Sequence, residues 1–105
     1  MLKSLLKLLG IGNKTDFRQL IQNGAVIIDV RSRGEFTSGH IKDAVNIPLD
    51  QLRSNTSRLK DKQQTIITCC ASGMRSASAK SMLKSLGYEH VYNGGGWYSL
   101  QRKIM

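Results

Sequence analysis

The sequence predicts an α/β domain with a mostly parallel central sheet flanked by helices. Helical and strand patterns alternate along the chain, which is typical of this fold class. Residues 25–30 and 65–70 form apolar or β-branched runs, as found in parallel strands that are buried on both faces. At 105 residues the chain is long enough for one domain. We assign residues 15–105 to this domain and residues 1–14 to an N-terminal extension.

The N-terminal extension has an amphipathic pattern. Its leucines recur at helical spacing, and its lysines fall on the other side. Lys7 interrupts the apolar stretch, which argues against a secretory signal. Two interpretations are open for residues 1–12: the leucines pack on the domain or on a second copy, or the segment contacts an anionic membrane surface. We favour packing, because so short a helix is only marginally stable alone.

The first part of the domain predicts a helix, a strand and a second short helix. Thr15 is the expected N-cap of a helix over residues 16–22, which an Asn-Gly pair closes. The apolar run over residues 25–30 is the first buried strand. Residues 31–40 are expected to form a short helix and a turn.

Shorter elements follow. Residues 44–48 predict a short strand that ends at the single proline, and a helix is expected to start at Leu49 and end near Leu59. The polar second half of this helix makes it weak. Near the C-terminus we expect a strand over residues 90–93, a glycine turn, and a last helix that begins at Trp97.

The strand over residues 65–70 leads into the clearest chemical signal. Cys70 ends this strand, small flexible residues follow, and a helical pattern then runs to a stop at Gly87. The free N–H groups of the loop and the helix N-terminus form a nest for an anion, and Arg75 adds a cation. Such surroundings lower a cysteine pKa to roughly 3.5–7.5. Cys70 is therefore a candidate nucleophile, the alternative being a buried structural cysteine.

The neighbouring Cys69 receives a different interpretation. Adjacent side chains on a strand point to opposite faces, so Cys69 faces away if Cys70 faces the site. A disulfide between adjacent cysteines would be strained. The two cysteines and the histidines show no familiar metal-ligand spacing, so we expect neither a metal nor a cofactor. Cys69 is expected to belong to the core. Asp29 ends the first strand as Cys70 ends the later one, so both are expected at one rim of the sheet.

Three motifs occur in order between residues 16 and 103. Asp29, Arg31 and Glu35 lie in the first, residues 70–76 read CASGMRS, and residues 93–97 read NGGGW. Together they resemble the N-terminal signature, the active loop and the closing turn of the rhodanese family of sulfurtransferases. The resemblance implies a rhodanese-like domain with a catalytic Cys70. The other residues of its substrate-binding active loop would be Ala71, Ser72, Gly73, Met74, Arg75 and Ser76.

The resemblance also assigns supporting roles. In the family, the residues that match Asp29, Arg31 and Glu35 brace the region beside the active loop, and we expect the same here. Arg31 and Glu35 are expected to pair with each other. His40 resembles a structural turn position, which we favour over a role as general base.

The resemblance implies a two-step sulfur transfer. Cys70 would take the outer sulfur of a small anionic donor such as thiosulfate, and the persulfide would pass it to cyanide or to a thiol-bearing acceptor. The alternatives are a non-enzymatic binding or sulfur-carrier module, or a cysteine phosphatase. Phosphatases of this class have five residues between nucleophile and arginine. Only four residues separate Cys70 from Arg75 here, and this spacing favours sulfur transfer.

Charge and composition limit the partners. The formal net charge is +9, and no acidic residue occurs between Asp61 and Glu89. Such a field attracts small anions and an acidic protein partner. No basic cluster interleaved with aromatics supports nucleic-acid binding. Two adjacent cysteines do not form a disulfide framework, which favours a reducing compartment, so we expect a cytoplasmic protein. No apolar run approaches the roughly 18 residues of a membrane span.

Overall fold

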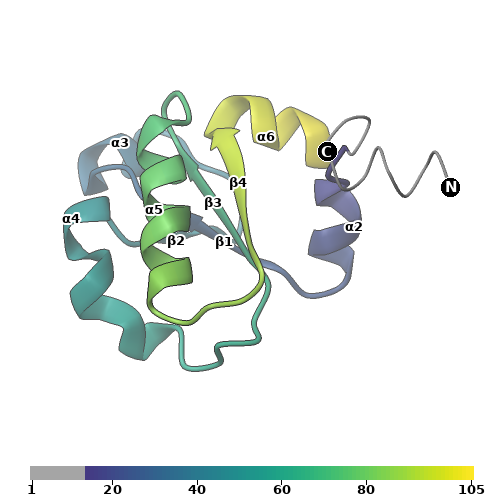
Figure 1. Cartoon of the computed structure of the whole chain (residues 1–105). Helices are drawn as coiled ribbons and strands as arrows, with labels where there is room; N and C mark the ends of the chain where they lie inside the picture. The colour runs from purple at the N-terminus through teal and green to yellow at the C-terminus, as the bar shows by residue number, and fades with distance from the viewer. Residues whose placement is uncertain (1–13) are drawn as a thin grey trace, which may run out of the picture.

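A computed structural model describes residues 14–105, which form a four-stranded sheet with helices on both faces (Figure 1). The strands lie in the order β2-β1-β3-β4, and every neighbouring pair is parallel. The prediction of an α/β domain with a parallel sheet is confirmed. The elements are α2 (Phe17–Gln22), β1 (Val26–Asp29), α3 (Arg33–Thr37), β2 (Val45–Asn46), α4 (Leu49–Leu52), η1 (Arg53–Arg58), β3 (Ile66–Cys70), α5 (Met74–Ser85), β4 (Val91–Gly96) and α6 (Trp97–Ile104).

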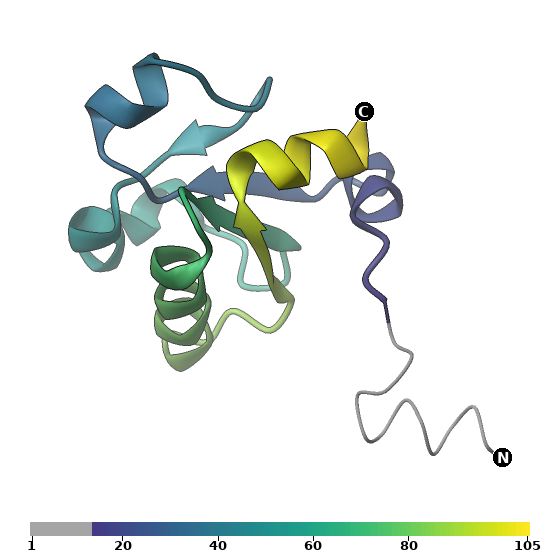
Figure 2. The same cartoon turned by 90° about the horizontal axis from the view of Figure 1, so that it is seen from above.

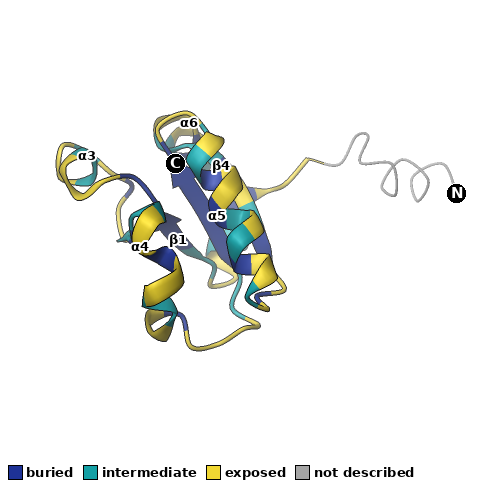
Figure 3. Ribbon diagram, turned by 60° about the vertical axis from the view of Figure 1, so that its left-hand side comes forward, coloured by how far each residue is buried: buried dark blue, intermediate teal, exposed yellow. Residues whose placement is uncertain are grey.

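The sheet separates two hydrophobic cores. The view from above shows helices on the two sides of the sheet that cover them (Figure 2). On one face Leu52 of α4 and Leu83 of α5 pack against Ile28 and Ile66. On the other face α2 and α6 pack against Ile67 and neighbouring strand residues. Burial is concentrated on the strands and on the inner sides of the helices (Figure 3). Because both faces of β3 are covered, all five of its residues are buried, which explains the unbroken apolar run.

Two local predictions were wrong. The N-cap of α2 is Asp16 and not Thr15, since the Asp16 carboxylate accepts a hydrogen bond from the Gln19 N–H at 3.0 Å. The helix begins at Phe17, so Asp16 and not Thr15 directly precedes the first helical residue and takes the N-cap position. The glycines expected to form a turn after the last strand instead extend β4 to Gly96. The weak helix after Pro48 does break, with α4 continuing as the 3-10 helix η1.

The N-terminal extension cannot be compared with its prediction, because residues 1–13 lie outside the described part of the chain. Whether residues 1–12 pack on the domain or contact a membrane stays a prediction. Within residues 14–105, none of the helices combines the length and the apolar character that crossing a membrane requires.

Candidate active site

The parallel strands bring the predicted site residues to one edge of the sheet. Asp29 at the end of β1 is paired with Cys69, and Cys70 at the end of β3 is paired with Gly96 of β4. The carboxyl ends of parallel strands are where ligands bind in α/β sheets. The expected shared rim of Asp29 and Cys70 is thus present.

The loop after Cys70 closes over its sulfur. The Gly73 N–H donates to Cys70 Sγ at 2.9 Å, and Ser76 Oγ lies 3.4 Å from the same sulfur. Gly73 has φ +108°, a left-handed conformation that side chains disfavour and that lets the chain turn directly into α5. Cys70 is only 1 % exposed, so the reacting atom of a substrate must enter the loop to reach it.

Burial and the loop have opposite effects on the Cys70 thiol. Burial raises the pKa of Cys70, whereas the hydrogen bond between Cys70 and the Ser76 hydroxyl and those from the N–H groups of Ser76, Gly73 and Ser72 lower it. The hydrogen bonds prevail, and the net result is a pKa below the usual value. This local environment favours the thiolate, the reactive form of cysteine.

Cys69 lies on the opposite face of β3, as expected. It is fully buried among Phe17, Ile27 and Leu100 in the core under α2 and α6. Burial, followed by the negative charge of Asp29, raises the pKa of Cys69 to about 12. Cys69 therefore stays a protonated core residue under ordinary conditions.

Glu35 forms its ion pair with Arg75 and not with Arg31, the partner predicted from the sequence. The two terminal nitrogens of Arg75 lie 2.7 and 2.9 Å from the Glu35 carboxylate oxygens. The predicted pair between Arg31 and Glu35 is wrong, because Arg31 hydrogen-bonds Glu35 at its backbone carbonyl, at 3.3 Å, and not at its carboxylate. The hydrogen bond from Arg75, with help from Ser32, lowers the pKa of Glu35 from 4.5 to about 2. Glu35 in turn raises the pKa of Arg75.

Arg31 pairs with Asp29 inside the protein. Its Nε and Nη2 atoms lie 3.0 and 2.8 Å from the two Asp29 carboxylate oxygens, and Asp29 is fully buried. Arg31 also donates to the Gly39 carbonyl at 2.6 Å, and its guanidinium lies 4.7 Å from the ring centroid of Trp97. This network joins the end of β1 to α3, and Glu35 extends the connection to Arg75 of α5.

The glycines at the end of β4 let that strand approach the loop. A Cβ atom on Gly96 would lie 3.0 Å from the Ala71 carbonyl oxygen, so only glycine fits without a shift. Beyond it, Trp97 packs on the core under α6, whereas Tyr98 is 63 % exposed. Met74 on the loop is also exposed, at 81 %.

The sequence places Asn93 only within the closing-turn motif and predicts no role for its side chain, which the structure brings into the site. Its Oδ1 atom accepts a hydrogen bond from the Ser76 hydroxyl at 2.7 Å and one from the Gly95 N–H at 2.9 Å. An asparagine immediately before glycines commonly bonds the backbone two residues on, and this was the available signal. The histidines are engaged elsewhere: His40 stacks on Phe36 and contacts its carbonyl, and His90 contacts the Gln63 side chain.

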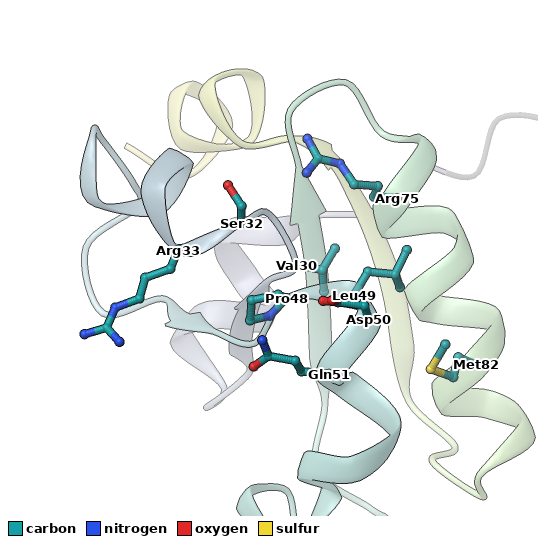
Figure 4. Close-up of a pocket in the computed structure, with 9 residues that line it drawn as sticks. All are labelled: Val30, Ser32, Arg33, Pro48, Leu49, Asp50, Gln51, Arg75 and Met82. Carbon is teal, nitrogen blue, oxygen red and sulfur yellow. The ribbon is translucent and has the colours of Figure 1, made fainter.

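A mainly apolar pocket of about 540 Å³ lies between α4 and α5 (Figure 4). Arg75 stands at its loop end, and Met82 lies further along α5. Its lining residues are Val30, Ser32, Arg33, Pro48, Leu49, Asp50, Gln51, Arg75 and Met82. None of them is a nucleophile of the kind that Cys70 provides, so the chemistry is assigned to the loop.

Comparison with known proteins settles the family. A model of the rhodanese-like domain matches residues 13–103. The chain belongs to the rhodanese family. Thiosulfate sulfurtransferase PspE of Escherichia coli is 37 % identical over 70 residues, which cover 66 % of this chain and 67 % of that protein. The human single-domain sulfurtransferase TSTD1 has a similar fold, with a TM-score of 0.72 and 28 % identity over 83 % of this chain and 90 % of that one.

Other rhodanese relatives differ in size and in described activity. Thiosulfate sulfurtransferase 18 of Arabidopsis thaliana is 35 % identical over 95 residues, covering 77 % of this chain and 69 % of that protein. A tRNA sulfurtransferase of Thermoplasma acidophilum is 33 % identical, but the match spans only 17 % of its length. The family and these relatives support sulfurtransferase activity in general terms.

Proposed function

We propose that this rhodanese domain is an enzyme that moves a sulfane sulfur from a donor such as thiosulfate, through a Cys70 persulfide, to a thiol or cyanide acceptor. The observation that carries the proposal is the short contact between Cys70 Sγ and the Gly73 N–H, at 2.9 Å, inside a loop that favours the thiolate. The sulfurtransferase relatives support the same reaction class.

The first step is attack of the Cys70 thiolate on the outer sulfur of the donor. With thiosulfate, a new S–S bond forms at Cys70, the S–S bond of the donor breaks, and sulfite leaves with the electron pair. The negative charge then lies on the outer persulfide sulfur. The N–H groups of the loop and the N-terminus of α5 stabilise this charge.

The second step regenerates the enzyme. An acceptor nucleophile attacks the outer sulfur, the S–S bond at Cys70 breaks, and the thiolate returns. Cyanide leaves as thiocyanate, whereas an acceptor thiolate leaves as a persulfide. The high positive charge of the chain favours anionic donors and an acidic protein as acceptor. The proposal involves no metal, cofactor or nucleic acid.

Loop length and the state of Arg75 favour this reaction over phosphate transfer. Four residues separate Cys70 from Arg75, which makes a tighter cradle than the five-residue spacing of related phosphatases. Both terminal nitrogens of Arg75 are bound by Glu35, so the guanidinium is not free to hold a phosphate. An intact loop with its cysteine in place likewise favours an enzyme over a non-catalytic binding module.

A thiosulfate:cyanide assay on two matched variants tests the proposal. Cys70→Ser should abolish thiocyanate formation, whereas Cys69→Ser should retain most of it, because Cys69 faces the opposite core. Circular dichroism checks that both variants fold. Equal loss of activity in two folded variants would overturn the assignment of Cys70.

A further inference from the structure

The hydroxyl of Ser76 has three neighbours that compete for one proton. Ser76 Oγ lies 2.7 Å from Asn93 Oδ1, 3.0 Å from the Gly73 carbonyl oxygen and 3.4 Å from Cys70 Sγ. Ser76 is fully buried, so water does not relieve the competition. A serine hydroxyl donates one hydrogen bond at a time. The neighbour that receives the Ser76 proton leaves the other two without a donated hydrogen bond.

The Gly95 backbone fixes which way the Asn93 amide points. Asn93 Oδ1 lies 2.9 Å from the Gly95 nitrogen, whose N–H group can only donate. The amide atom that faces Gly95 must therefore be the oxygen, and the same oxygen faces Ser76. Asn93 Oδ1 and the Gly73 carbonyl oxygen can both only accept, and the Ser76 proton points to Asn93 because that oxygen is nearer, at 2.7 Å against 3.0 Å. The lone pairs of Ser76 are then left to accept the S–H proton of the Cys70 thiol.

The hydrogen bond must reverse when Cys70 loses its proton. A thiolate accepts but cannot donate, so the Ser76 hydroxyl stabilises it only by turning away from Asn93. We propose that Asn93 is a positioning residue that draws the Ser76 proton away from Cys70 and so limits how strongly the loop stabilises the thiolate. When a sulfur is added to Cys70, the charge moves to the outer sulfur and the Ser76 proton returns to Asn93.

This arrangement has a chemical advantage. A thiolate that is stabilised too strongly is a weaker nucleophile, and the best attacking thiol has a pKa near the ambient pH. Without Asn93, the loop would stabilise the Cys70 thiolate too strongly. By drawing the Ser76 proton away, Asn93 would keep the thiolate a reactive nucleophile. The inference rests on the proposed function for its purpose, but the effect on the thiol exists whether or not sulfur is transferred.

Other charged groups surround the thiol and stay constant in the test. Arg75 with its partner Glu35 flanks the loop, and the buried pair of Asp29 and Arg31 lies at the end of the adjacent strand. Cys69 is the remaining ionisable neighbour on β3 itself. Neutral substitutions of Asn93 change none of these charges.

The test measures the Cys70 pKa from the pH dependence of the rate of alkylation by iodoacetamide. All variants carry Cys69→Ala, so that Cys70 is the only thiol that reacts. Asn93→Ala removes the nearer of the two oxygens that compete with Cys70 for the Ser76 proton and leaves only the Gly73 carbonyl. This variant should lower the Cys70 pKa by about half a unit to one unit, the size of one neutral hydrogen bond. Asn93→Val, which suits a strand, is the second variant if the first does not fold. A purely structural role for Asn93 would loosen the loop and raise the pKa instead.

A double-mutant cycle isolates the path through Ser76. Ser76→Ala alone should raise the Cys70 pKa, because the thiolate loses a donor. In the Ser76→Ala background, Asn93→Ala should produce no further shift. An unchanged or raised pKa in the single Asn93 variant, or an equal shift in both backgrounds, would overturn the inference. Alkylation of Cys70 does not require sulfur transfer. If the pKa shifts follow the expected pattern but the wild-type protein transfers no sulfur, only the proposed function is refuted.

Discussion

The carboxylate of Glu35 holds both terminal nitrogens of Arg75, at 2.7 and 2.9 Å, and joins α3 to the first turn of α5. The pair neutralises the only cationic side chain in the active loop, since Ala71, Ser72 and Met74 are neutral. Anion binding in this loop therefore depends on its backbone N–H groups, on the N-terminus of α5 and on the general positive field of the protein.

Removing the Glu35 charge should improve the use of a dianionic donor. Glu35→Gln leaves Arg75 unpaired beside the loop, and the KM for thiosulfate should fall about two- to fivefold, the range expected for one partly exposed charge interaction. Steady-state kinetics with cyanide as acceptor measure this change. Glu35→Asp retains the negative charge and should keep the original KM, and a rise in the KM of Glu35→Gln would show that the pair is needed to shape the loop.

The same pair should make stability depend on acid pH. Hydrogen bonds from Arg75 and Ser32 lower the pKa of Glu35 from 4.5 to about 2. Its stabilising contribution is therefore complete above about pH 4.5 and is lost as the pH falls towards 2. Urea unfolding of the wild type and Glu35→Gln should differ by a constant amount from pH 7 to 4.5 and converge below that. A difference that vanished between pH 7 and 5 would contradict the assigned pKa.

The buried pair of Asp29 and Arg31 should contribute more to the free energy of unfolding than the partly exposed pair of Glu35 and Arg75. Arg31→Met leaves the Asp29 carboxylate buried without its partner, and such a loss costs about 3–5 kcal/mol. Urea unfolding at pH 7 measures the change in the free energy of unfolding. Asp29→Asn with Arg31→Met removes both charges, and this double variant should be more stable than Arg31→Met alone. Equal stabilities would mean that Arg31 acts through its packing on Trp97 and not through the charge.

Loop length should decide which anion the site accepts. One glycine inserted between Gly73 and Met74 gives the five-residue spacing, and it moves the Gly73 N–H away from Cys70 Sγ, where it now lies at 2.9 Å. Thiosulfate:cyanide transfer should fall at least tenfold, as expected for a loss of about 1.4 kcal/mol of transition-state stabilisation, while phosphate-like oxyanions should bind more tightly. Unchanged sulfur transfer in the folded variant would show that loop length is not the discriminator.

The strands, most helices and the position of Cys70 were predictable because they follow from local patterns. The apolar run of β3 predicts a buried strand without information from other parts of the chain, and Gly73 likewise indicates the turn before α5. The partners of Arg31 and Glu35 were not predictable in this way. Each of these side chains could form an ion pair with a sequence neighbour or with a distant residue. Arg75, the partner of Glu35, lies forty positions away in the sequence. The role of Asn93 was hidden for the same reason, because only the folded sheet brings β4 beside Ser76.

Intact-mass spectrometry after incubation with thiosulfate detects the proposed Cys70 persulfide itself. The wild type and Cys69→Ser should each gain the mass of one sulfur atom, and cyanide should remove it. Fragmentation should locate the sulfur on Cys70, and Cys70→Ser should gain none. A sulfur adduct that persists in Cys70→Ser would show that another residue carries the sulfur. Turnover by the wild type without any sulfur adduct on Cys70 would likewise rule out the persulfide mechanism.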